Sequence, residues 1–288
     1  MSAVGLAVTF VLGGLVAALA VVLVGFNIRR VATRTRAQAL PESIRREVLA
    51  RIDTAGMEDG SSVLLLRMVD GPGTDVRSRV GGTPVLPPGT PPPSLLSDQD
   101  WTFLAQIGLH TPPLPDAWSR RAVLIFSNSI GTLAACSLEV AEPVSEAPLD
   151  GAFARPVRGV DTLRLPLADE GDDRRLVPSY TPGALLRRIP ALRQLLADRG
   201  DTPERLLPHI LVPGIGTHEI DTFHVSLMGG EPELIQSEHE TRCGQCSRPM
   251  RFLFQLGDVL GLPGDAPVVY VYGCDAHPDQ VEVRMDMH

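Results

Sequence analysis

The most constraining feature of this 288-residue chain is an apolar stretch near its amino terminus. From Ala3 to Phe26 there is no charged residue, and Thr9 is the single polar side chain. A helix of this length crosses the roughly 30 Å hydrocarbon core of a bilayer with some tilt. A buried core helix is rarely this long or so apolar on every face. The sequence therefore predicts that residues 1–28 form one transmembrane anchor.

The charges that flank this stretch predict its orientation. Arg29, Arg30, Arg34 and Arg36 follow it, whereas no basic residue precedes it. The positive-inside rule then puts the amino terminus outside and the body in the cytoplasm. A cleaved signal peptide is the alternative, but it normally has Lys or Arg before its apolar core and a small-residue cleavage site after it. The expected location is the cell membrane, with a single pass, and the bilayer is one expected partner.

The charge of the body argues against a nucleic-acid partner. All 26 basic residues of the chain are Arg, and they stand against 34 acidic residues, so the formal charge is -8. An acidic body is not typical of proteins that bind the phosphate backbone, so we expect no nucleic acid. Without Lys the chain has no Gly-Lys-Ser/Thr phosphate loop, and it has no Gly-x-Ser-x-Gly turn. Nucleotide hydrolysis and serine-hydrolase chemistry therefore lose their usual motifs.

Two regions have the residue spacing of helices. Apolar residues from Ile44 to Ile52 recur every three or four positions and predict an amphipathic helix from Pro41 to about Gly56. With the basic residues before it, this helix makes residues 29–58 a juxtamembrane segment. A second helical pattern runs from Ala184 to Leu196, and Pro190 should kink it or split it into two short helices.

Short apolar runs predict that the rest of the body is rich in strands. These runs are residues 63–66, 103–109, 122–126, 132–140, 251–256 and 268–272. The six prolines between Pro84 and Pro93 predict an extended loop without regular structure. Recognition of that loop by an SH3-like partner is an alternative role for it.

The two halves of the body resemble each other in sequence. Gly81 to Leu86 resembles Gly229 to Leu234, and Phe103 to Gly108 resembles Phe252 to Gly257. A third apolar strand follows in both halves, so three matches occur in the same order and predict an internal repeat. We therefore expect an α+β, β-rich fold of two internally repeated sheet halves with an inserted helical region, preceded by one transmembrane helix. The body is residues 59–288: repeat one 60–142, the insert 143–217, and repeat two 218–288.

These matching residues also resemble the YwqG-like proteins, a bacterial family of unassigned function. Its first-half pattern, a Gly-Gly-x-Pro-x-Leu-Pro loop and a Phe-Leu-x-Gln strand, is similar to Gly81–Pro87 and Phe103–Gln106. Its second-half pattern is similar to Gly230–Gln236 and Phe252–Leu256. The Trp-Pro pair common after the first loop of that family is missing here. The resemblance covers about residues 60–285 and implies an α+β fold of repeated sheets, but no reaction.

Gln106 and Gln255 interrupt otherwise apolar strands at equivalent positions of the two halves. One interpretation is that both amides face a shared cleft and bind a ligand. The other is that each amide satisfies backbone groups at a sheet edge or at the seam between the halves.

The sharpest chemical motif lies near the carboxyl terminus. Cys243-Gly-Gln-Cys246 is followed after 27 residues by Cys274-Asp-Ala-His277. Ligands two residues apart can bind one ion from a tight turn, and the two intervening strands would bring both turns together as a zinc ribbon. Three thiolates and an imidazole complete a tetrahedral shell without an open position, so we expect a structural zinc ion. Unliganded thiols, or a redox or disulfide pair, are the alternatives.

This tail also resembles the carboxyl-terminal domain of the programmed cell death protein 2 family, in which a Cys pair precedes a strand containing Leu-Gln and another Cys follows the next strand. A thioredoxin-like site would need a helix starting at the Cys pair, but Pro249 and an alternating strand follow it.

The remaining reactive side chains form no motif of known chemistry. Cys136 lies in an apolar run and is best explained as a small buried hydrophobe. Several His and Glu residues occur between residues 209 and 240, but no His-Glu-x-x-His spacing joins them, so solvated side chains are the simpler explanation.

The sequence thus predicts a membrane-tethered cytoplasmic binding or scaffold module with structural zinc and an unidentified protein or small-molecule partner. The alternative is an enzyme of unknown reaction whose site lies in the cleft between the repeats and uses Gln106, Gln255 and either His224 or His239. No catalytic residue is assigned.

Overall fold

The computed structural model describes most of the chain from residue 31 onward. The described residues are 22, 24–25, 28, 31–61, 63–70, 73, 77–90, 93–97, 100–109, 114–140, 145–146, 157–166, 182–197, 199–211, 226–232, 234, 240–257, 260, 262 and 267–287. Residues 31–39 are helical and lead into the first labelled helix, α2 (Glu42–Glu58).

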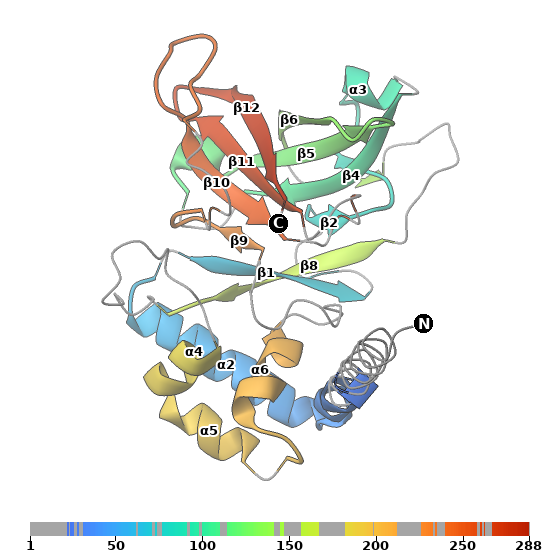
Figure 1. Cartoon of the computed structure of the whole chain (residues 1–288). Helices are drawn as coiled ribbons and strands as arrows, with labels where there is room; N and C mark the ends of the chain where they lie inside the picture. Colours follow the sequence, from blue (N-terminus) through green and yellow to red (C-terminus); the bar gives the residue numbers. More distant parts are fainter. Residues whose placement is uncertain are drawn as a thin grey trace, which may run out of the picture.

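Ten antiparallel strands of the described chain form one sheet (Figure 1). Its two central strands are β1 (Leu64–Asp70) and β8 (Arg158–Arg164), which pair along their whole length. Outward from β1 follow β9 (Leu227–Met228), β10 (Arg251–Leu256), β11 (Val268–Cys274) and β12 (His277–Asp286). Outward from β8 follow β2 (Arg79–Val80), β4 (Trp101–Gly108), β5 (Arg121–Asn128) and β6 (Leu133–Glu139). The edge strands β6 and β12 approach each other, so the sheet curls until it is nearly closed.

The inner face of this sheet encloses the main hydrophobic core. Successive side chains of a strand point to opposite faces, so alternate residues of each strand enter the core. Trp118 of the short 3₁₀ helix η1 (Asp116–Trp118) is fully buried among them. Burying each large apolar side chain stabilises the fold by about 1.5–3 kcal/mol. The core includes Leu64, Leu66, Met68, Ile107, Val123, Ile125, Val160, Phe254, Leu256, Val269 and Val271.

A layer of helices covers the outer face of the two central strands (Figure 1). This helical layer consists of α2, α4 (Pro182–Arg188), α5 (Pro190–Leu196) and α6 (Pro203–Leu211). Leu65 of β1 and Leu163 of β8 pack against its buried leucines. The arginine Arg67 of β1 ties α6 to the sheet, because its guanidinium donates to the terminal carbonyls of Leu211 (2.9 Å) and Ile210 (3.2 Å). Orphan carbonyls at the end of α6 are thereby satisfied.

The helices that the sequence predicts are found in this layer. The helix expected from Pro41 to about Gly56 is α2. Pro190 divides the later pattern into α4 and α5, where it occupies the first turn of α5 and lacks only an N–H that has no helical partner there. The helix α6 was not predicted.

The strands of the sheet correspond one to one across its centre. The order β8-β2-β4-β5-β6 in one direction matches β1-β9-β10-β11-β12 in the other. The pair Arg67–Asp161 lies at the middle of the β1–β8 register, with three residue pairs on either side. The sheet therefore has two halves of five strands that match in strand order on either side of this central pair.

Irregularities of the ladders occur at matching places in the two halves. The β4–β5 register shifts at Leu104, and the β10–β11 register shifts at Leu253. An edge-to-face aromatic pair with ring centroids 5.9 Å apart stands beside each shift. These pairs are Phe103–Phe126 and Phe252–Tyr272. Register shifts and aromatic pairs depend on specific local packing. Their occurrence at matching positions of the two halves therefore supports the internal repeat that the sequence predicts.

The strand order assigns β1 and β8 to halves of the sheet that the predicted repeat bounds do not indicate. β1 lies in predicted repeat one but joins the half built from β9 to β12, whereas β8 lies in the predicted insert but joins the half built from β2 to β6. The half that contains β9 to β12 therefore takes its central strand from the start of the body, whereas the strands of the other half lie in one continuous part of the chain.

One predicted loop contains regular structure. Within the proline-rich segment, Val85–Leu86 forms the strand β3, which pairs with β7 (Ser145–Glu146) in a separate two-stranded sheet. The expectation of a loop without regular structure was therefore wrong here. Proline removes only its own N–H, so Val85 still donates its backbone N–H, to Oε1 of Gln106 at 3.0 Å. The helix α3 (Ser94–Ser97) follows.

The predicted transmembrane anchor lies almost entirely outside the described residues. Of Ala3 to Phe26, the structure describes Val22, Val24 and Gly25. Within the part of the chain that is described, no helix has the length and apolar character needed to cross a bilayer.

Two glycines with positive φ provide a test of the close contact between their loop and the residue just before β8. A Cβ on Gly82 (φ 67°) would lie 2.3 Å from Cγ2 of Val157, whereas a Cβ on Gly89 (φ 80°) would meet nothing within 4 Å. Gly82→Ala should therefore destabilise the protein by about 1–3 kcal/mol more than Gly89→Ala, because only the first adds a clash to the same backbone cost. Chemical denaturation of the two variants measures the difference. Equal losses of stability would show that the loop does not pack as described.

Candidate metal centre

The first pair of candidate ligands lies in a tight loop before β10. The loop is closed by backbone hydrogen bonds from Cys243 N to Arg248 O (2.9 Å), from Ser247 N to Cys243 O (2.8 Å) and from Met250 N to Thr241 O (3.0 Å). Among the described residues, Ser247 is the one non-glycine residue with positive φ, at 57°. The backbone thus turns sharply enough to direct Cys243 and Cys246 toward one point.

The second pair lies in the hairpin turn between β11 and β12. Cys274 and His277 are cross-strand partners that flank a two-residue turn. β10 begins where β11 ends, since Arg251 pairs with Gly273. Both turns therefore meet at the same end of the β10–β11 ladder, as the ribbon arrangement predicts.

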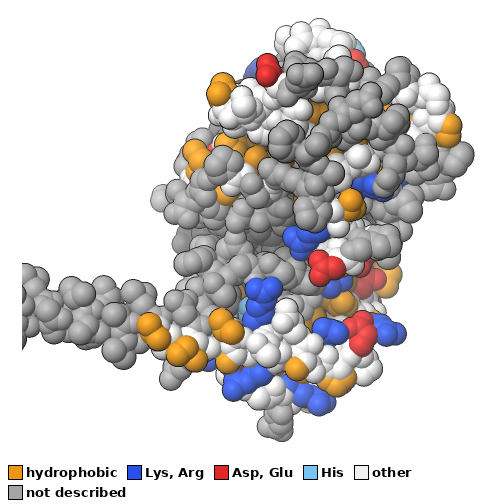
Figure 2. All heavy atoms as spheres, turned by 90° about the vertical axis from the view of Figure 1, so that its right-hand side faces the viewer, with side chains coloured by type: hydrophobic (Ala, Val, Ile, Leu, Met, Phe, Trp, Pro, Cys, Tyr) orange, Lys and Arg blue, Asp and Glu red, His pale blue; other side chains and the backbone are white. Residues whose placement is uncertain are grey.

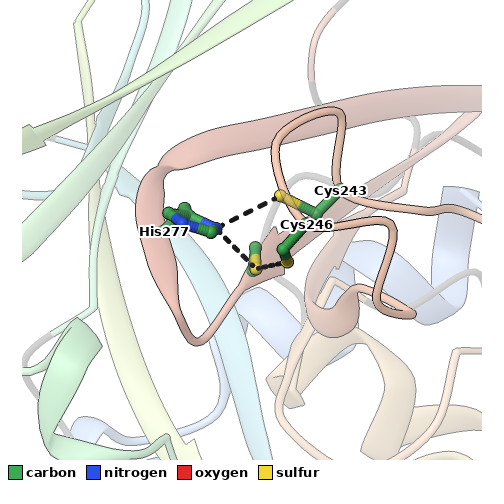
Figure 3. A group of neighbouring side chains, drawn as sticks. Cys243, Cys246 and His277 are labelled. Atoms are coloured by element: carbon green, nitrogen blue, oxygen red, sulfur yellow. Dashed lines mark hydrogen bonds between the residues drawn. The ribbon is translucent and has the colours of Figure 1, made fainter.

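The four predicted ligands converge in space (Figure 3). Their ligand atoms all lie within 4.8 Å of one another, and Cys243 and Cys274 are buried. Sγ of Cys243 and Sγ of Cys274 lie 3.6 and 3.8 Å from Nδ1 of His277, and Sγ of Cys246 lies 3.7 Å from Sγ of Cys274. A tetrahedral ion with metal–sulfur distances of about 2.3 Å and metal–nitrogen distances of about 2.1 Å needs separations of about 3.6–3.8 Å. The four residues can therefore hold one metal ion.

The same distances exclude a disulfide in this state. Bonded sulfurs lie about 2.05 Å apart, whereas Cys246 and Cys274 are 3.7 Å apart, and all four cysteines are free.

The surroundings of Cys243 favour the thiolate form of its side chain. Burial opposes ionisation of Cys243, but the backbone N–H groups of Cys246 and Gln245 and the neighbouring thiols lower its pKa to about 6. For Cys274, burial and the Cys243 thiol raise the pKa, so of these two thiols Cys243 ionises more readily.

A second set of side chains holds the Cys-x-x-His turn in place. The carboxylate of Asp275, between the two ligands, accepts hydrogen bonds from Arg251 Nη2 (2.8 Å) and from Trp118 Nε1 (2.9 Å). The Arg251 hydrogen bonds are the main reason that the pKa of Asp275 is lowered. The Trp118 ring lies against Gly273, where a Cβ would lie 2.3 Å from the ring. The first half of the sheet therefore supports the metal ligands of the second half.

The matching hairpin of the first half is built without metal ligands. Asn128 ends β5 as Cys274 ends β11, and its Oδ1 accepts the backbone N–H groups of Ile130 (3.2 Å) and Thr132 (2.8 Å). An amide caps one hairpin where two metal ligands flank the other.

The amide of Gln106 serves the backbone of a neighbouring strand. Its Oε1 accepts the N–H of Val85 (3.0 Å) and its Nε2 donates to the carbonyl of the same residue (2.9 Å). Gln255 is fully buried at the matching position of β10. For Gln106 these bonds correspond to the interpretation in which the amide satisfies backbone groups, and the ligand-binding role of the two residues stays a prediction.

The structure describes only some of the other side chains that the sequence singles out. His224 and His239 lie outside the described residues. Burial raises the pKa of Cys136 to about 11, so its thiol is neutral near pH 7 and does not resemble an activated nucleophile. Within the described ranges, the Cys3His cluster is the one group that could hold a metal ion. A hollow of about 430 Å³ lies elsewhere, between the ends of α2 and α4, and is lined by Ala55, Glu58, Asp59, Arg187 and Arg188.

Sequence reasoning found the four ligands but not the residues that support them. Asp275 stands inside the Cys-x-x-His motif and could have been considered. Trp118 is 157 residues away from it, and no local pattern connects the two. Comparison with known proteins adds no assignment, since no protein-family model and no curated protein matches the chain.

Removing one ligand tests the metal centre. Cys246→Ser should lose bound metal and melt at a lower temperature. Structural zinc sites in small peptides are worth on the order of 10 kcal/mol, which is large beside the roughly 5–15 kcal/mol that stabilises most proteins. Cys136→Ser is the matched control, because it removes a thiol that lies outside the cluster. Elemental analysis and calorimetry of purified protein measure both effects, and equal metal contents in the two variants would contradict the assignment.

The left-handed residue of the first turn gives a second test. Ser247→Gly should leave metal affinity nearly unchanged, because glycine adopts φ near 57° without steric cost. Ser247→Val should destabilise the turn by about 1–3 kcal/mol and weaken metal binding, because a β-branched residue is strained in this conformation. Competition with a chelator measures the affinities. If valine were tolerated as well as glycine, the turn would not depend on this backbone conformation.

Proposed function

We propose that the protein is a membrane-tethered binding or scaffold module whose body lies in the cytoplasm and is stabilised by a structural zinc ion. The observation that supports this most directly is the Cys3His arrangement. Four protein ligands at tetrahedral separations leave no position for a substrate or an activated water, which is typical of structural and not catalytic zinc.

The donor set favours zinc over other common metals. Thiolates bind soft or borderline ions, whereas magnesium and calcium prefer oxygen ligands. A tetrahedral shell of sulfur and nitrogen is the usual geometry of zinc, since its filled d shell imposes no other preference. The ion would fasten the loop before β10 to the β11–β12 turn. Its contribution would therefore be to stability of the second half.

Exposed apolar side chains at the start of the described chain support the membrane tether. Val22, Val24, Ile28 and Val31 are all exposed, and Figure 2 shows apolar side chains where this helix leaves the body. At about 100° per residue, Val24, Ile28 and Val31 share one side of a helix and Val22 lies on the opposite side. Apolar side chains all round a helix are typical of a membrane span.

A fusion experiment tests the tether and its orientation. A reporter that works only in the cytoplasm, fused after His288, should be active, because the four Arg that follow the apolar stretch favour the cytoplasmic side. Deleting residues 1–28 should release the body from membranes while it keeps its metal. A reporter active only after export would contradict the orientation. A full-length protein that stays in the soluble fraction would contradict the tether.

A further inference from the structure

The helix that leads from the predicted anchor is fixed to the body by one carboxylate. Asp201, in the turn between α5 and α6, has a side chain only 7% exposed. It accepts hydrogen bonds from the Thr33 hydroxyl and from the backbone N–H of Thr202 (2.8 Å). Arg36 and Arg205 place their guanidinium groups 3.5 and 3.6 Å from its oxygens. Two elements that are 168 residues apart thus share one nearly buried carboxylate.

Apolar packing adds to this attachment. Thr33 and Ala37 are buried, and their spacing of four residues puts them on one side of helix 31–39; Leu40, which directly follows the helix, is buried as well. A Cβ on Gly200 would lie 3.6 Å from Cδ of Arg36, so the turn and the helix are in contact. The exposed side of the same helix bears Val31. One side of the helix therefore belongs to the body, and the other is free for lipid.

Positive charge is concentrated in the segments that form the helical layer and in the residues that lead into it. Residues 29–59 and 182–211 hold 12 Arg and 8 acidic residues. The rest of the chain holds 14 Arg and 26 acidic residues. Figure 2 shows basic side chains over the layer, near the base of the amino-terminal helix. The body is thus positively charged beside the anchor and negatively charged elsewhere.

We propose that helix 31–39 is a rigid strut that holds the turn between α5 and α6 against an anionic lipid surface; this rests on the membrane tether proposed above. An α-helix rises 1.5 Å per residue, so an anchor that ends near residue 28 puts Arg36 within about 12 Å of the bilayer along the axis. That is between one and two Debye lengths at physiological salt. Exposed Arg199, next to the docked Gly200, is therefore within electrostatic reach of headgroups.

An anionic headgroup layer fits this surface better than a neutral one. The cytoplasmic leaflet is negatively charged, and it attracts basic residues that lie near it. The acidic remainder of the body is repelled by the same charge. A fixed strut would therefore give the body one preferred orientation, in which the turn between α5 and α6 faces the lipid.

Energy transfer from the body to labelled headgroups tests the strut. Full-length protein with a fluorescent amino acid at Gln194, an exposed position of α5, is reconstituted into phosphatidylcholine vesicles with and without phosphatidylglycerol. Asp201→Ala should cause a loss of transfer, because the helix and the turn separate. Thr33→Val should act in the same direction while leaving the body sequence unchanged. Glu204→Ala is the matched control, since its carboxylate pairs with Arg193 and not with the strut.

The lipid charge is tested in the same assay. Arg199→Glu should lower transfer in vesicles that contain phosphatidylglycerol and leave it unchanged in phosphatidylcholine alone. If Arg199→Glu shows the same transfer as the wild type in vesicles that contain phosphatidylglycerol, or lowers it equally in phosphatidylcholine alone, the anionic surface is wrong. If Asp201→Ala and Thr33→Val keep full transfer, with metal content and melting showing folded protein, the strut is wrong. If the wild-type protein fails to float with vesicles at all, the tether itself is wrong.

Discussion

The antiparallel pairing of β1 and β8 is the interaction on which the rest of the structure depends. On one face these strands support the main core, and on the other they support the helical layer. Each strand also begins one half of the sheet, so both ladders grow outward from this pair. Its centre, at Arg67 and Asp161, is polar, and Arg67 reaches the carboxyl end of α6. Because β1 and β8 are distant in sequence, the two halves are joined only when these strands pair.

The halves meet a second time at the seam between β6 and β12, and there the contacts are made by side chains. Trp118 of the first half donates to Asp275 of the second, and Arg121 donates to the carbonyl of Pro278 at 3.2 Å. Both acceptors lie in or beside the Cys-x-x-His turn. A metal ion in the Cys3His cluster would therefore stiffen the turn that the seam is built on. The stability of the candidate metal centre and the closure of the sheet therefore depend on the same turn.

The two halves share the same hydrogen bonds at their inner strands and differ at their outer hairpin turns. Gly81 N donates to Leu104 O at 2.7 Å, and Gly229 N donates to Leu253 O at 2.9 Å. A buried serine also lies at the matching place in each half: the hydroxyl of Ser78 accepts a hydrogen bond from Gly108 N, and that of Ser226 accepts one from Gly257 N. These positions are constrained on every side by the core. The outer hairpins are less constrained, so one could take Asn128 as its cap and the other its metal ligands.

Local chain geometry explains what the sequence determined by itself. Six strands, the division of a helix at Pro190 and the four ligands all follow from spacings of a few residues, which fix where neighbouring side chains point. The alternation of Val281, Val283 and Met285 in β12 was of the same kind and was overlooked. The tertiary structure alone decided the place of β8 beside β1, the docking of helix 31–39 on Asp201 and the contact of Trp118 with Asp275. These contacts join residues 88 or more positions apart, and each must repay the entropy of closing a long intervening loop.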